Sequence, residues 1–177
     1  GQGLATYKEL IRNMSTKTRP EGGALTLILD RWISGIQSDV AQSGIAVGSE
    51  EFDQRCEARI HEVVSTLSEL VHGFDFAQLL VMYFRAYMQD DDDTKAKVVK
   101  WFRGEYANKT EARAELGVRI VIGDDDWYEY IKLFASFLVQ AGYAGMLVLI
   151  DELVNIYKIP NAITRQYNYE KILTMYN

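Results

Sequence analysis

The stretch MLVLIDEL, from Met146 to Leu153, is the part of the sequence that decides the fold class. Its first five residues are all apolar, and Asp151 and Glu152 follow them at once. A continuous apolar run of this length is typical of a strand that is buried on both faces of a parallel sheet. Because ligands bind beyond the carboxyl ends of the strands in such a sheet, we expect the two carboxylates to lie at a ligand-binding edge.

The two carboxylates match the Walker B arrangement of nucleotide hydrolases. Asp151 would accept hydrogen bonds from magnesium-bound water, and Glu152 would orient and deprotonate the water that attacks a γ-phosphate. The same letters also describe an ordinary strand that leaves the core and meets solvent. The motif alone therefore leaves both interpretations open.

A Walker B motif acts together with a phosphate-binding loop, which this sequence lacks. That loop is written G-x-x-x-x-G-K-[ST], and its backbone amides and lysine hold the phosphates of the nucleotide. No glycine is followed by a lysine anywhere in the chain. Magnesium is usually held by one or two carboxylates together with the phosphates, so Asp151 has little to hold by itself. We therefore expect a piece of an ATPase that does not act alone.

Composition and charge limit the class of protein. The chain has 177 residues, the size of one ordinary domain, and a formal charge of -6, which argues against indiscriminate coating of nucleic acid. Cys56 is the single cysteine, so no internal disulfide forms, and a reducing compartment suits the chain. The apolar runs are too short to cross a bilayer. These features predict a soluble, cytoplasmic protein without a membrane partner.

Helical spacing dominates residues 1–117. Apolar stripes predict helices over 4–14 and 25–36, and Ser49 is expected to cap a long helix over 50–71. Cys56 lies on the stripe of that helix, so it is expected to be a core residue, not a nucleophile. Asp75 is expected to cap the next helix, over 76–88. The stripe of the 50–71 helix consists of Phe52, Cys56, Ile60, Val63, Leu67 and Leu70.

From residue 118 onward the pattern changes. Alternation in GVRIVIG predicts a short strand at about 118–122, a helix capped by an aspartate follows and ends at Gly142, and 146–150 is the second strand. Strand, helix, strand is one parallel crossover unit. The predicted fold is mainly α, a single-domain fragment of a P-loop NTPase fold. Its helical region covers 1–117, and the small α/β element with the Walker B strand and flanking helices covers 118–177.

Two charged stretches invite functional readings. The four aspartates at 90–93 resemble a metal site, but consecutive like charges on a turn are usually solvated and complement the dipole of the next helix, which is the reading we favour. The stretch 94–113 is the most basic part of the chain and could contact phosphates and stacked bases, although its aromatic residues at helical spacing are more often core. The candidate nucleic-acid contacts are Lys95, Lys97, Lys100 and Arg103, with Trp101, Phe102 and Tyr106 among them.

The loop STKTRPEGG, residues 15–23, is a further candidate contact. Thr16, Lys17, Thr18 and Arg19 could meet phosphate or a partner. A connector between two helices, with a proline and glycines at the turn, is the plainer interpretation. His61 and His72 have no clustered ligand partners in the sequence.

Several segments carry a resemblance to a known family. They are GQGLATYKELIRNMSTKTRPEGGAL (1–25), KWFRGEYANKTEARAELGV (100–118), WYEYIKLFASFLVQAGYAGMLVLIDELVNIYKI (127–159) and NYEKILTMYN (168–177). In this order they resemble the bacterial P-loop proteins known as BREX system ATP-binding domain proteins. That family has long been grouped as a P-loop domain of unknown function and is found with phage-defence clusters.

The resemblance implies an AAA-like ATPase. Its P-loop would lie upstream of Gly1, and its remaining sheet and arginine-bearing elements would lie beyond Asn177, in keeping with a chain whose two ends both look cut. Asp151 carries over as the metal residue and Glu152 as the catalytic residue. ATP and Mg²⁺ would be cofactors of the parent protein, with none bound tightly to this chain. The expected partners are the rest of the parent chain and, as a further expectation, other defence-system subunits or DNA.

Two rival functions stay open. In the first, the chain is a non-catalytic helical module for protein or DNA interaction, and Asp151 and Glu152 merely end a strand or helix. In the second, it is a helical nucleic-acid-binding domain whose affinity falls steeply with salt and depends on Lys100 and Arg103.

Overall fold

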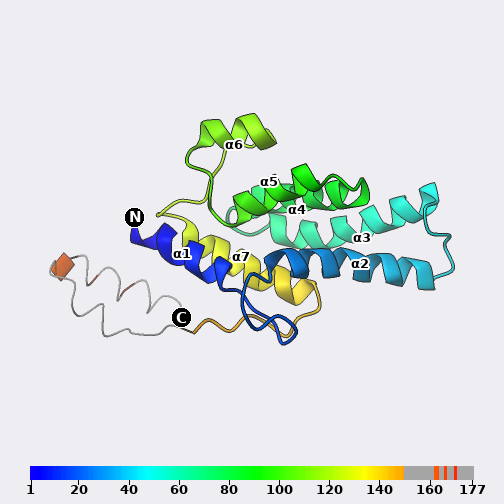
Figure 1. Cartoon of the computed structure of the whole chain (residues 1–177), viewed down its shortest axis with the longest axis horizontal. Coiled ribbons are helices and arrows are strands. Elements are labelled where there is room, and N and C mark those ends of the chain that lie inside the picture. Colours follow the sequence, from blue (N-terminus) through cyan, green and yellow to red (C-terminus); the bar gives the residue numbers. More distant parts are fainter. Residues whose placement is uncertain (150–161, 164–165, 167–169, 171–177) are drawn as a thin grey trace. The chain divides into compact units, whose positions relative to one another are not determined.

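The computed structural model describes residues 1–149, 162–163, 166 and 170. The chain divides into two compact units, Gly1–Met146 and Leu147–Asn177, and all of the helices bounded here belong to the first unit (Figure 1). They are α1 (Gln2–Arg12), α2 (Leu25–Gln42), α3 (Glu50–Ser68), α4 (Gly73–Met88), α5 (Asp92–Phe102), α6 (Lys109–Leu116) and α7 (Trp127–Gln140). The prediction of a mainly helical chain is confirmed.

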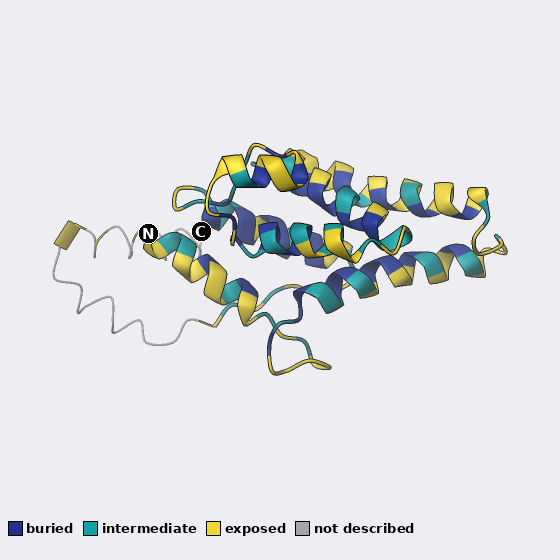
Figure 2. Ribbon diagram, turned by 45° about the horizontal axis from the view of Figure 1, so that its top comes forward, coloured by how far each residue is buried: buried dark blue, intermediate teal, exposed yellow. Residues whose placement is uncertain are grey.

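The first unit is built from neighbouring helices. Helices α2, α3, α4 and α5 contact one another in chain order, α7 packs against α1 and α3, and α6 packs against α5 (Figure 1). Each helix turns its buried residues inward and its exposed residues outward (Figure 2). Within the described ranges, no helix combines the length and the apolar character that a bilayer crossing requires.

Aromatic side chains from three helices form the centre of the core. Phe76 of α4 lies with its ring centroid 5.0 Å from that of Phe102 of α5 and 5.0 Å from that of Phe134 of α7, both at steep angles. Phe137 lies one turn further along α7, and all four side chains are fully buried. Edge-to-face pairs of this kind add stability beyond the area they bury. The core therefore joins the consecutive helices α4 and α5 to α7, which lies further along the sequence.

Helix α3 agrees with its sequence pattern except at one residue. The Ser49 side chain accepts a hydrogen bond from the backbone N–H of Phe52, so the predicted N-cap is confirmed. Cys56 is fully buried, as expected. The prediction that Val63 faces the core is wrong, because Val64 takes that place and continues the four-residue step from Ile60.

The junction between α3 and α4 corrects two further predictions. Helix α3 ends at Ser68, so Leu70 lies beyond it and is exposed. Asp75 does not cap α4, because α4 already begins at Gly73, after His72 in a left-handed conformation with φ 58°. Gly73 is required here: a Cβ at this position would lie 1.8 Å from the carbonyl oxygen of Leu67.

Neither of the two predicted strands is formed among the described residues. Residues 118–122 have no regular secondary structure. Val118 and Ile122 are buried in the helical core, and the Ile120 carbonyl accepts a hydrogen bond of 2.7 Å from the Trp101 indole instead of a strand amide. Residues 146–149 also lack regular structure, and Ile150 lies outside the described residues. A strand needs a neighbour to pair with, and the one β-bridge in the described part joins Thr16 and Arg19.

Candidate functional site

The end of α7 fixes where the apolar run before the two carboxylates begins. Gly142 has φ 95°, and its N–H donates to the Val139 carbonyl at 3.1 Å. The next N–H, of Tyr143, donates to the Leu138 carbonyl at 2.9 Å. These two bonds form a Schellman motif, which ends a helix and turns the chain away from its axis. The predicted helix end at Gly142 is confirmed.

The described part of the apolar run has no regular secondary structure, and two of its four side chains are exposed. Residues 146–149 form no helix and no strand, and the exposed fraction is 84% for Leu147 and 81% for Leu149. Two large exposed apolar side chains differ from what is expected of a strand that is buried on both faces. Asp151 and Glu152 lie outside the described residues, and their predicted roles stay predictions.

The aspartate run at 90–93 is used by the helices on either side of it. Asp90, with φ 53°, lies just past the end of α4, where the Asp91 N–H donates to the Ala86 carbonyl at 2.9 Å. Asp91 then caps α5, because its side chain accepts a hydrogen bond of 3.0 Å from the Thr94 N–H. Asp92 and Asp93 lie in the first turn of α5, where they complement the helix dipole. The structural reading of this run is confirmed.

No metal-binding group is present in the part of the chain that the structure describes. Within it, no three side chains of histidine, cysteine, aspartate or glutamate lie close enough together to hold a metal ion.

Lys95 is held inside the helical unit and not presented to solvent. Its ammonium lies 3.3 Å from a carboxylate oxygen of Asp30 on α2, and 5.5 Å and 5.1 Å from the ring centroids of Tyr83 and Tyr87 on α4. Only 18% of its side chain is exposed. Lys95 therefore links three helices through an ion pair and two cation–π contacts.

Lys97 and Lys100 are also paired with carboxylates. Lys97 lies 2.6 Å from Asp93, and Lys100 lies 2.6 Å from Glu111 and 3.4 Å from Glu115 on α6. The hydrogen bond from Lys100 to Glu111 raises the pKa of Lys100 and lowers the pKa of Glu111. The two ion pairs of Lys100 join α6 to α5, whereas the pair of Lys97 and Asp93 lies within α5. Together they neutralise the positive charge of two of the four candidate phosphate contacts.

Arg103 and the three aromatic residues complete the basic stretch. Among the described residues, Arg103 has no carboxylate partner. Trp101, Phe102 and Tyr106 are all buried, which confirms that they are core residues and not stacking platforms for bases. The stretch thus keeps one unpaired cation of the four candidates.

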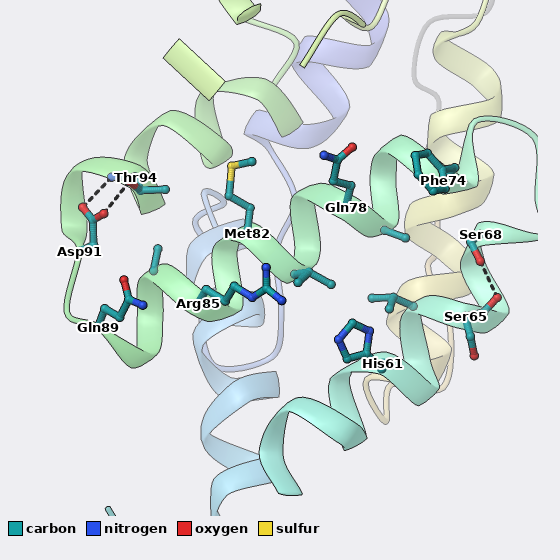
Figure 3. A pocket seen from close by; sticks show the side chains of 14 residues that line it. His61, Ser65, Ser68, Phe74, Gln78, Met82, Arg85, Gln89, Asp91 and Thr94 are labelled. Carbon is teal, nitrogen blue, oxygen red and sulfur yellow. Dashed lines mark hydrogen bonds between the residues drawn. The ribbon is translucent and has the colours of Figure 1, made fainter. Parts of the chain in front are cut away.

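A groove that sequence reasoning missed lies between α3 and α4. It has a volume of about 810 Å³, and Figure 3 shows His61 of α3 and Arg85 of α4 among the residues around it. Arg85 donates a hydrogen bond of 2.7 Å to Glu57, which lowers the pKa of that carboxyl. The apolar lining of the groove consists of Val64, Phe74, Ala77, Val81, Met82 and Ala86.

Exposed apolar residues continue this groove at the junction of α3 and α4. The exposed fraction is 44% for Leu70, 62% for Val71 and 71% for Phe74. The sequence signal for this surface was the cluster of apolar letters around His72, where a helix end leaves them outside the core. Open apolar surface of this kind is typical of an interaction site.

Comparisons with known proteins add the family. The family described as BREX system ATP-binding protein BrxC/D matches residues 1–177, which is the whole chain. No curated protein and no solved structure matches the chain. The resemblance noted in the sequence and the family match thus agree over the full length, and the chain belongs to the BREX system ATP-binding protein BrxC/D family.

Proposed function

We propose that this chain is part of an ATP-hydrolysing P-loop protein of AAA-like type, with Asp151 on Mg²⁺ and Glu152 as the base. The observation that carries the proposal is the match to an ATP-binding family over all 177 residues. The order of residues also supports it, because the apolar run 146–150 is followed directly by Asp151 and Glu152, as in a Walker B motif. On the same family membership we infer a role in phage defence.

The chemistry assigned to the two carboxylates is simple. When bound, Mg²⁺ stabilises the charge that develops on the γ-phosphate. Asp151 would help to hold the ion through its water ligands, and Glu152 would accept the proton of the attacking water. A phosphate-binding loop has to come from another part of the parent protein, because no Gly-Lys pair occurs in this sequence. The isolated chain is therefore expected to be inactive and to bind neither ATP nor Mg²⁺ tightly.

The proposal also assigns a structural role to residues 146–150. In the parent protein this run would be a parallel strand with neighbours on both sides, and Leu147 and Leu149 would then be buried. Residues 1–146 would form a helical region inserted between the phosphate-binding loop and the Walker B strand. The rest of the parent chain is the first partner, and other defence-system subunits are further ones.

Nucleotide binding tests this proposal. Calorimetry with ATP and Mg²⁺ is carried out on the 177-residue chain and on the full-length parent protein. We expect binding by the parent alone. Binding by neither protein would contradict the proposal and favour a non-catalytic interaction module.

That interaction module is the second candidate, and the groove between α3 and α4 favours it. The groove, which Phe74 lines, and the exposed Leu70 and Val71 at the same helix junction offer apolar side chains to a protein partner. The nucleic-acid version, through Lys100 and Arg103, stays a prediction. Unchanged DNA binding after reversal of both charges would contradict it.

A further inference from the structure

The loop between α1 and α2 contains a small, well-defined hairpin. The Thr16 N–H donates to the Arg19 carbonyl at 3.1 Å, and the Arg19 N–H donates to the Thr16 carbonyl at 3.1 Å. Lys17 and Thr18 form its two-residue tip, and both are exposed. This paired turn is more ordered than a plain connector needs to be.

The base of the hairpin is fastened to the end of α1. The Gly23 N–H donates to the Arg12 carbonyl, and the Ala24 N–H donates to the Met14 carbonyl, each at 2.9 Å. The Arg19 side chain donates to the Gly22 carbonyl at 3.1 Å. The tip is therefore presented in a fixed place and does not have to be ordered when a ligand binds.

Two threonine hydroxyls leave one hydrogen-bond donor to spare. The Thr18 hydroxyl oxygen accepts from the Arg31 guanidinium at 2.7 Å, the Thr16 hydroxyl oxygen accepts from the Arg19 N–H at 3.2 Å, and the two oxygens lie 3.2 Å apart. One hydroxyl hydrogen can lie between the two oxygens, so the other is left for an outside acceptor. Arg31 has five N–H groups and uses one here, so four remain.

The positive charge of this hairpin is largely uncompensated. Lys17 and Arg31 are exposed, and within the described residues neither has a carboxylate within 4.0 Å, while Arg19 has Glu21 at 3.7 Å. Lys95, by contrast, is neutralised by Asp30. In a chain with a formal charge of -6, the hairpin is therefore a local cationic site with free donors.

We propose that the hairpin Thr16–Arg19, together with Arg31, binds the phosphate backbone of nucleic acid. A guanidinium with free donors and a hydroxyl group match phosphate oxygens, and contacts to phosphate carry no sequence information. A polymer backbone suits the site better than a free nucleotide does, because the tip is exposed and a backbone adds several weak contacts. The proposal does not depend on ATP hydrolysis by the parent protein.

Fluorescence anisotropy tests this site. Binding of labelled duplex DNA is measured without nucleotide at salt concentrations of about 50 to 200 mM. The variant Lys17→Gln/Arg31→Gln removes two cations, and the control Arg55→Gln/Arg119→Gln removes two exposed cations elsewhere. The hairpin variant should weaken binding to all sequences and lower the slope of log K against log salt by about 2. The control should leave both unchanged.

A second variant, and a measurement of ATP binding beside that of DNA, separate the other outcomes. Thr18→Ala removes the hydroxyl that holds Arg31 and should give a smaller loss in the same direction. Thermal unfolding followed by circular dichroism checks that every variant is folded. Absence of DNA binding by the unaltered chain, an equal loss in the two double variants, or binding of ATP with Mg²⁺ but not of DNA would each overturn the proposal.

Discussion

The carboxylate of Asp124 accepts a hydrogen bond of 2.9 Å from the backbone N–H of Leu4, 120 residues away in the sequence. The first N–H groups of a helix have no partner within the helix, so a side chain from elsewhere has to satisfy them. Asp124, in the turn that precedes α7, accepts the hydrogen bond of one such N–H group of α1. The contact ties the start of the helical unit to the turn that precedes α7.

Removing this cap should destabilise the chain. Asp124→Ala is expected to lower the free energy of unfolding by about 0.5–1 kcal/mol, at the low end for a helix cap because the aspartate is partly exposed. Asp125→Ala is the matched control and should have no effect, since Asp125 is exposed beside it. Urea unfolding at neutral pH measures both. An equal effect of the two variants would contradict the capping role.

The same contact makes a prediction about pH. The hydrogen bond from Leu4 lowers the pKa of Asp124 in the folded chain. A lowered pKa stabilises the fold above the unfolded value of about 4, and this stabilisation is lost as the pH falls through the folded pKa. The difference in unfolding free energy between the unaltered chain and Asp124→Ala should therefore shrink below about pH 4. If the difference in unfolding free energy grew as the pH fell, the lowered pKa of Asp124 would be contradicted.

Asp90 lies in a backbone conformation that favours glycine. Its φ of 53° is left-handed, and it follows α4 at the place where a glycine usually ends a helix. Asp90→Gly should therefore raise the free energy of unfolding by about 0.5–1 kcal/mol. Asp92→Gly, in the first turn of α5, should lower it because glycine is a poor helix former. Thermal unfolding of the two variants should shift in opposite directions, and a shared downward shift would count against this account.

Two phenylalanines on α4 should differ sharply in their effect on stability. Phe76 is fully buried among the rings of the core, whereas the exposed fraction of Phe74 is 71%. Phe76→Ala should lower the unfolding free energy by about 3–5 kcal/mol, because it removes apolar contacts and leaves a cavity. Phe74→Ala should change the unfolding free energy little. If this variant binds a protein partner less well, the groove is part of the binding site. Chemical denaturation compares them, and similar losses would show that the core is placed wrongly.

The buried hydroxyl of Tyr83 should make stability depend on alkaline pH. It donates a hydrogen bond of 2.5 Å to Asp30, and burial, together with this bond, raises the pKa of Tyr83 far above its ordinary value. Tyr83→Phe should lower the unfolding free energy by about 1 kcal/mol at neutral pH. Above about pH 10 the unfolded tyrosine ionises while the folded one stays protonated, so the difference between the two proteins should narrow.

The control for this pair is Tyr143→Phe, since the described structure gives Tyr143 no side-chain hydrogen bond. Denaturant unfolding at several pH values measures both variants. A difference for Tyr83→Phe that stayed constant up to strongly alkaline pH would contradict the raised pKa.

Much of the helical unit could be predicted from the sequence because local signals set it. The serine cap at Ser49, the turn of the four aspartates and the glycine at 142 act through bonds to neighbours in the chain, so short patterns reveal them. The same rules place Cys56 in the core. The shift from Val63 to Val64 is an error of one residue, within the tolerance of a period of 3.6.

The remaining features depend on contacts between distant parts of the chain. Residues 118–122 alternate like a strand, but the Trp101 indole takes the Ile120 carbonyl, and no sequence pattern announces that contact. The ion pairs of Lys95 and Lys100 likewise join separate helices, so a basic stretch in the sequence became a set of structural links. The groove between α3 and α4 also arises only when the two helices pack.

We propose that Glu152 is the catalytic base of the ATPase of which this chain is a part. The most direct measurement is the rate of ATP hydrolysis by the full-length parent protein, compared with its Glu152→Gln variant and with Glu105→Gln as the control at an exposed glutamate. We expect Glu152→Gln to lower turnover by about 10²-fold or more while nucleotide binding persists, and Glu105→Gln to leave turnover unchanged. Turnover by the Glu152→Gln protein equal to that of the unaltered protein would contradict it.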